Sequence, residues 1–234
     1  MGLAVAGTLA SYAIGWLIGL PGLVPFLNAA LPWWLMAKSL RLGQVRRAIA
    51  IMLVWALTMA VAATSMAALG WSRTRSNGDL FLRSEYRDEM IEWVRTGIGP
   101  ESQPGVFIPR HVGYAAAFTA AAIATGGALA MPMGAVLMNQ MGEYVGSMAR
   151  QSAHPTTSVM LGWHPWAIVR VIGFVMIGVV LSGVLLSRVL KFPYSLARHR
   201  RFLFIGGGLL ALDIALKAVL APAWGAILKG VAGW

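Results

Sequence analysis

Long apolar stretches alternate with short polar clusters along this chain. Three windows, Ile49–Gly70, Gly113–Met138 and Val171–Ser187, contain no Asp, Glu, Lys, Arg or His. A helix needs about 20 predominantly apolar residues to cross the hydrocarbon core of a bilayer. Because a soluble domain rarely holds three windows of this length and character, the pattern predicts membrane-spanning helices.

Extended over the whole chain, the same pattern predicts an all-α protein, a polytopic bundle with about five to seven membrane segments. We interpret residues 1–234 as one membrane domain, since no fixed-period repeat or linker divides the sequence. Residues 72–110 form a sizeable polar region that is expected outside the membrane. The predicted membrane segments are about 3–20, 23–37 (short or interfacial), 49–70, 111–131, 133–149, 163–188 and 202–221.

The basic clusters at 38–47 and 188–201 bear on how often residues 111–150 cross the membrane. Basic residues in short loops favour the cytoplasmic side. If both clusters are cytoplasmic, an even number of crossings separates them, and 111–150 is a hairpin broken near Met131–Met133. Region 72–110 then lies outside. The alternative, a single crossing, would place one basic cluster outside.

Residues 84–95, within the polar region, have the pattern of an amphipathic helix. The apolar face is spaced at i, i+4, i+7 and i+8, which brings these side chains together on one side of a helix. We therefore predict one outer amphipathic helix, lying on the membrane or on a partner protein. The face consists of Tyr86, Met90, Trp93 and Val94.

Composition and charge strengthen the membrane interpretation. Hydrophobic residues make up 58% of the chain and charged residues 12%, whereas soluble domains carry about 25% charged residues. The net charge of +11 comes mostly from short loops beside apolar segments, which favours contact with anionic lipid over nucleic acid. The absence of cysteine excludes disulfides, thiolate metal sites and cysteine nucleophiles.

The N-terminal apolar stretch differs from a signal peptide. Residues 1–37 contain no Lys or Arg, so the basic region that precedes the apolar part of a signal peptide is missing. We expect this stretch to remain as a membrane segment. The sequence is interpreted as a multi-pass protein of a bacterial inner membrane.

Ionisable residues inside apolar segments are costly and mark candidate functional positions. Asp213 and Lys217 lie four residues apart in the last segment, so they share one helix face. They form either a proton or ion relay or a self-neutralising pair. Glu143, one turn after Asn139 and Gln140, completes the candidate ion or proton pathway.

Histidines provide the second set of candidates. In the hairpin arrangement His111, His154, His164 and Glu143 approach the outer face, near Arg110 and Arg170. Imidazole and carboxylate groups bind zinc or copper, so these four form a candidate metal site. His111 and His164 are also candidate ligands of a b-type haem, or part of a quinone site. Their spacing matches no established metal motif such as H-E-x-x-H.

Three functions are compatible with these sequence features. We first expect a non-catalytic membrane subunit or anchor of a larger bioenergetic or transport complex, because the sequence lacks a recognisable catalytic set such as G-x-S-x-G. The expected partners are the lipid bilayer and other membrane protein subunits. The alternatives are a small transporter or channel that uses Glu143, Asp213 and Lys217, and a haem- or quinone-binding redox subunit.

Overall fold

Helices form most of the protein in a computed structural model that describes residues 1–71 and 84–234. No strand occurs among these residues, which confirms the all-α prediction. Part of the predicted polar region, 72–83, lies outside the described residues. The helices are α1 (Gly2–Ile18), η1 (Pro21–Leu23), α2 (Val24–Arg41), α3 (Val45–Ala68), α4 (Ser84–Thr96), η2 (Pro100–Ser102), α5 (Pro104–Thr125), α6 (Ala130–Gln151), α7 (Pro155–Gly162), α8 (Pro165–Val189) and α9 (Leu196–Ala232).

Four of the described helices, α3, α5, α8 and α9, are long and apolar enough to cross a membrane. They indicate a membrane protein. The apolar helix α1 has 17 residues and is shorter than these four. Helix α6 is not among the four, although its residues contribute to the predicted segment 133–149. Asn139, Gln140, Glu143 and Arg150 make α6 more polar, and most of its residues are buried inside the protein.

Two glycines separate α5 from α6. Gly126 and Gly127 have φ angles of +58° and +86°, which glycine adopts without steric cost. A side chain at Gly127 would also lie 2.5 Å from the Ser182 hydroxyl of α8. Trp33 Nε1 of α2 donates a hydrogen bond of 2.8 Å to the Gly126 carbonyl. The helical break therefore lies before Met131–Met133, at a turn packed between α2 and α8.

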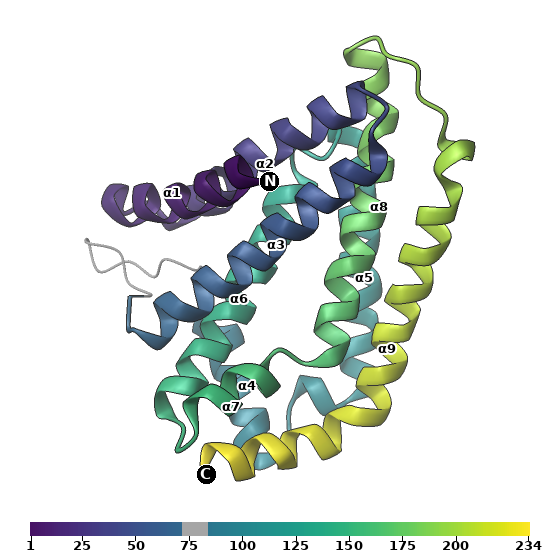
Figure 1. Ribbon diagram of the computed structural model, residues 1–234. Coiled ribbons are helices and arrows are strands. Elements are labelled where there is room, and N and C mark those ends of the chain that lie inside the picture. Colours follow the sequence, from purple (N-terminus) through teal and green to yellow (C-terminus); the bar gives the residue numbers. More distant parts are fainter. Residues whose placement is uncertain (72–83) are drawn as a thin grey trace.

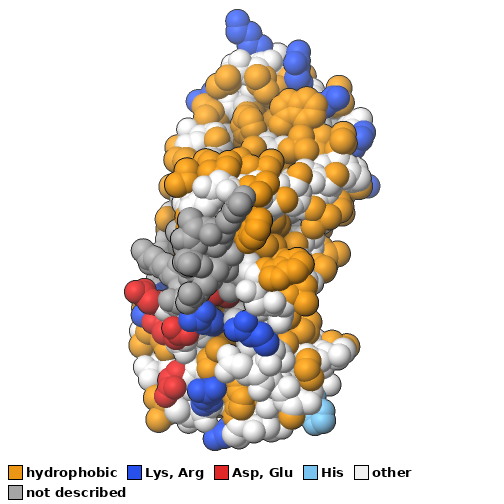
Figure 2. All heavy atoms as spheres, turned by 90° about the vertical axis from the view of Figure 1, so that its left-hand side faces the viewer, with side chains coloured by type: hydrophobic (Ala, Val, Ile, Leu, Met, Phe, Trp, Pro, Cys, Tyr) orange, Lys and Arg blue, Asp and Glu red, His pale blue; other side chains and the backbone are white. Residues whose placement is uncertain are grey.

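Both basic clusters lie at one end of the molecule. The α2–α3 connection and the α8–α9 connection are close together in Figure 1, whereas α4, α7 and the C-terminus lie at the opposite end. Figure 2 shows Lys and Arg side chains at the first end, an apolar middle, and mixed acidic and basic side chains toward the other. Helices α3, α5, α6 and α8 connect the two ends, so the clusters need not lie on opposite sides of a membrane.

The amphipathic helix predicted at 84–95 is confirmed as α4, but its apolar face is covered by the same chain. Met90, Trp93 and Val94 are almost fully buried. They join one apolar cluster with Tyr144 of α6 and Leu228 of α9. The apolar side of α4 therefore packs inside the protein and not against lipid or a partner, because the ends of the long helices α6 and α9 cover it.

Candidate functional site

A buried ion pair connects α8 to α9. Arg170 donates from Nε to Asp213 Oδ2 at 2.9 Å and from Nη2 to Asp213 Oδ1 at 3.0 Å. The Asp213 side chain is 2% exposed and that of Arg170 is 20% exposed. Two parallel charge-assisted hydrogen bonds hold the guanidinium in one orientation. The pair therefore holds two apolar helices in one register.

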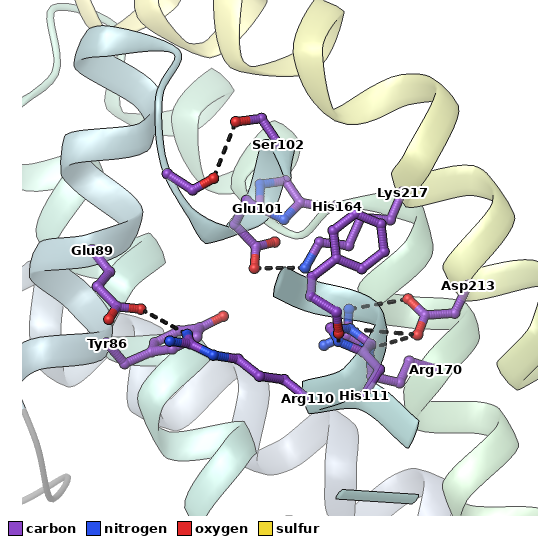
Figure 3. A network of polar contacts seen from close by, with 12 residues as sticks. Tyr86, Glu89, Glu101, Ser102, Arg110, His111, His164, Arg170, Asp213 and Lys217 are labelled. Carbon is purple, nitrogen blue, oxygen red and sulfur yellow. Dashed lines mark hydrogen bonds and ion pairs between the residues drawn. The ribbon is translucent and has the colours of Figure 1, made fainter. Parts of the chain in front are cut away.

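A second buried pair connects α9 to η2. Lys217 Nζ donates to Glu101 Oε1 at 2.6 Å, and the Lys217 side chain has no exposed surface. The ammonium also lies 4.6 Å from the centre of the Phe107 ring, a geometry that favours a cation. Asp213 and Lys217 thus share a helix face as expected, but each is paired with a residue from another segment (Figure 3).

His111 lies beside the first pair. Its Nδ1 is 2.8 Å from the Phe107 carbonyl oxygen, and a carbonyl can only accept, so Nδ1 carries the hydrogen. In the neutral ring, Nε2 then carries a lone pair and can only accept a hydrogen bond. Nε2 lies 3.8 Å from Asp213 Oδ2 and has no hydrogen-bond partner among the described residues. This acceptor is therefore enclosed and has no hydrogen-bond donor among the described residues.

Four of these groups line one end of a cavity of about 910 Å³ between α5, α8, α9 and the α4–η2 region: Glu101, His111, Arg170 and Asp213. The wall next to them is apolar and includes Phe174, Leu210 and Ile123. On α5, small side chains leave space for this volume. At the mouth, Arg110 and Glu89 form an exposed pair at 3.4 Å. The small residues of α5 are Ala115, Ala116, Thr119 and Ala120.

His164 is held in a separate aromatic cluster. Its ring stacks on Trp166 at 4.6 Å between centroids and meets the edge of Trp93 at 5.6 Å. Its Nε2 lies 3.5 Å from the Tyr144 hydroxyl, and His164 does not line the cavity that His111 lines. The two candidate haem ligands therefore lie in different surroundings, His111 beside the cavity and His164 among aromatic rings.

The remaining candidates lie elsewhere. Glu143 is buried in α6 and accepts a hydrogen bond from Arg87 Nη1 of α4 at 3.2 Å. His154 is exposed at the start of α7. Within residues 1–71 and 84–234, no cluster of three or more His, Asp or Glu side chains is placed to hold a metal ion. The predicted set of His111, His154, His164 and Glu143 does not converge.

Sequence reasoning missed Glu101, which partners Lys217. Glu101 lies in the short η2 turn, which begins at Pro100 directly after Gly99. A single acidic residue in such a loop carries no local signal. Sequence reasoning also did not predict that the small residues of α5 line a cavity. Alanine is common in membrane helices, so only the placement of α8 and α9 reveals the space beside them.

Burial lowers the pKa of His164 to about 3, with a smaller contribution in the same direction from the positive charges of Arg170 and Lys217. The unfolded chain takes up this proton near pH 6.5, whereas the folded protein resists until about pH 3. Because the unfolded state binds more protons in that window, stability falls as the pH decreases from 6.5 toward 3. The slope contributed is about 1.4 kcal/mol per pH unit.

We expect His164→Gln to have a shallower dependence of unfolding free energy on pH, by about one proton. Equilibrium unfolding in mixed micelles between pH 4 and pH 7 measures this slope. His154→Gln, at an exposed position, is the matched control and should keep the wild-type slope. If the unfolding free energies of wild type and His164→Gln changed equally with pH, the burial of an uncharged imidazole at His164 would be contradicted.

Comparison of this chain with models of protein families, with curated proteins and with solved structures found no match.

Proposed function

We propose that this chain is a non-catalytic membrane protein of a bacterial inner membrane that binds an amphipathic, lipid-like molecule between α5, α8 and α9. One observation carries the proposal: a single cavity of about 910 Å³ joins a charged end to an apolar wall. Ligand sites are mostly apolar, with a few polar groups that orient the ligand. The polar head would lie beside His111, Arg170 and Asp213.

Access from the membrane supports a lipid-like ligand. Helices α5 and α9 border the cavity, and both are candidate membrane spans with largely exposed residues. Val112 and Ile123, which line the cavity on α5, are 56% and 43% exposed. An apolar tail can therefore reach the wall from the hydrocarbon core without crossing water.

The placement of charge favours binding over transport. The ion pairs of Arg170 and Lys217 lie toward the α4–η2 end. Toward the Gly126 turn, the lining of the cavity is apolar and includes Ala120 and Ile123. Transport pathways place ionisable groups where the substrate passes. Glu143, the third residue of the predicted pathway, is instead paired with Arg87.

Photo-crosslinking tests this proposal. The protein would be placed in phosphatidylcholine vesicles with hexadecanol that carries a diazirine in its chain. We expect saturable labelling of peptides that contain Ala115–Ile123 of α5 and Leu210–Ile214 of α9, because these segments line the cavity. Unlabelled hexadecanol should compete for this labelling but not for labelling of the bulk lipid-facing surface.

Filling the cavity provides the matched variants. Ala116→Phe and Ala120→Phe add a ring to the cavity lining, whereas Ala117→Phe adds the same ring at an exposed α5 position outside the lining. We expect the first two variants to lose the saturable labelling several-fold and the third to keep it. Equal labelling of all three variants, or labelling that never saturates, would contradict the proposed site.

A further inference from the structure

The two basic clusters form one surface, although they are far apart in the sequence. Leu40 and Val45, on either side of the α2–α3 connection, belong to one apolar cluster with Leu186 of α8. Phe192 and Tyr194 of the α8–α9 connection pack against the same cluster, so the two connections meet at one end of the molecule (Figure 1). We call this surface the basic end. Its exposed cations are Lys38, Arg41, Arg46, Arg47, Arg188, Lys191, Arg198, Arg200 and Arg201.

No carboxylate of the described residues balances the basic end. Residues 1–78 and 144–212 contain no Asp or Glu, and none of these cations forms an ion pair in the part of the chain that the structure describes. Asp213 lies twelve residues after Arg201 in α9, which is about 18 Å along a helix. The Debye length at physiological salt is only about 8 Å, and Asp213 is already paired with Arg170. An uncompensated positive potential therefore surrounds this end.

The cations at the start of α3 and α9 do not stabilise the helices that carry them. Arg46 and Arg47 lie in the first turn of α3, and Arg198 lies in the first turn of α9. The partial positive charge of a helix N-terminus disfavours cations there. Neither first turn contains an acidic residue. An anion outside the protein accounts for this placement, whereas the stability of the two helices does not.

The basic end also lies at the depth of lipid headgroups. Helix α8 ends there, α3 and α9 begin there, and all three are candidate membrane spans. Apolar side chains beside the charges are largely exposed, with Leu42 at 60%, Val189 at 64% and Phe204 at 74%. Lys and Arg at the ends of membrane helices extend their charged groups to the interface and keep their apolar stems in the hydrocarbon. Lipid phosphates are therefore the anions within reach.

We infer that the basic end is a docking surface for the headgroups of anionic phospholipids such as phosphatidylglycerol, formed jointly by the α2–α3 and α8–α9 connections. The inference is independent of the cavity between α5, α8 and α9. The opposite end lacks this preference, because exposed cations there are balanced by carboxylates, as in the pair of Arg110 with Glu89. Basic clusters beside membrane helices attract anionic lipids of the cytoplasmic leaflet.

Local quenching of a fluorophore by two lipids tests the inference. The chain has no cysteine, so Leu42→Cys labels the basic end and Ile98→Cys the opposite end, at side chains that are 60% and 70% exposed. Each labelled protein would be placed in phosphatidylcholine vesicles with increasing fractions of nitroxide-bearing phosphatidylglycerol or phosphatidylcholine. At Leu42→Cys we expect phosphatidylglycerol to give half-maximal quenching at an about fivefold lower fraction, the effect of one basic residue near an anionic surface. At Ile98→Cys the two lipids should quench equally.

Neutralising each connection shows whether both contribute. Arg46→Gln with Arg47→Gln removes two charges from the α2–α3 side. Arg200→Gln with Arg201→Gln removes two from the α8–α9 side. In the Leu42→Cys protein, we expect each pair of changes to reduce the preference for phosphatidylglycerol and the four together to abolish it. A preference that depends on one connection alone, or that survives all four changes, would overturn the shared surface.

Two controls separate local docking from attraction to a basic protein as a whole. Arg95→Gln with Lys229→Gln removes the same charge from exposed positions at the opposite end and should leave the preference at Leu42→Cys unchanged. Raising the salt to 1 M should remove the preference, because the Debye length falls to about 3 Å. Equal quenching by the two lipids at Leu42→Cys, or an equal preference at Leu42→Cys and Ile98→Cys, would overturn the inference.

Discussion

Replacing Asp213 with alanine should lower the free energy of unfolding by about 3–5 kcal/mol. Asp213 is 2% exposed and holds Arg170 through two hydrogen bonds of 2.9 and 3.0 Å. Without the carboxylate, a guanidinium between α8 and α9 is left without its counter-charge. Desolvation of an unpaired charge costs far more than loss of the attraction itself. Equilibrium unfolding in mixed micelles measures the change.

Two controls distinguish charge from packing. Glu89→Ala breaks the ion pair with Arg110, in which the Arg110 and Glu89 side chains are 60% and 47% exposed, and exposed pairs contribute about 0–1 kcal/mol. The double variant Arg170→Met with Asp213→Ala removes both charges and should recover most of the lost stability. If the double variant were as unstable as Asp213→Ala alone, the loss would come from side-chain volume and not from the unpaired cation.

Gly146→Ala should cost about 2–3 kcal/mol through overpacking between α3 and α6. A Cβ atom at Gly146 would lie 2.6 Å from Ala67 Cβ and 2.8 Å from the Ala68 backbone nitrogen, and it would also clash with the Thr64 carbonyl. Backbone atoms of a neighbouring helix cannot rotate away. A Cβ atom at Gly142, one turn earlier, would likewise lie 2.5 Å from Ala63 Cβ. Helix α6 therefore approaches α3 along a face made of glycines.

Gly207→Ala is the matched control because a Cβ atom there has no neighbour within 4 Å. Alanine is favoured over glycine inside a helix by about 1 kcal/mol, so this change in α9 should be neutral or stabilising. Thermal unfolding of both variants in the same detergent compares them directly. Similar melting temperatures for Gly146→Ala and wild type would show that α3 and α6 can separate without loss, contrary to the packing described.

The helical class followed from the sequence alone because a bilayer leaves few choices. Backbone polar groups in hydrocarbon must be satisfied within the segment, so a long apolar window is a helix. The break between α5 and α6 was expected near Met131–Met133 but lies at 126–129. Pro132 occupies the first turn of α6, where proline is tolerated. Gly126 and Gly127, with positive φ, make the turn.

The partners of the buried charges were beyond sequence reasoning. A spacing of four residues predicts that Asp213 and Lys217 share a helix face, and both lie buried in α9. Arg170 is 43 residues from Asp213, and Glu101 is 116 residues from Lys217. Helical periodicity relates only residues of the same helix, so it favoured an ion pair between Asp213 and Lys217. Packing of α8 and η2 against α9 provided closer partners.

Three properties of this chain can be read from its residues without a structure: its helical class, the stretches apolar enough to cross a membrane, and the side chains that are costly to bury. These properties depend on composition and on the fixed period of a helix. The different surroundings of His111 and His164, and the cavity that α5, α8 and α9 enclose, arise only when the helices pack. A cavity is the space between segments distant in sequence, and no local pattern encodes the distance between two helices.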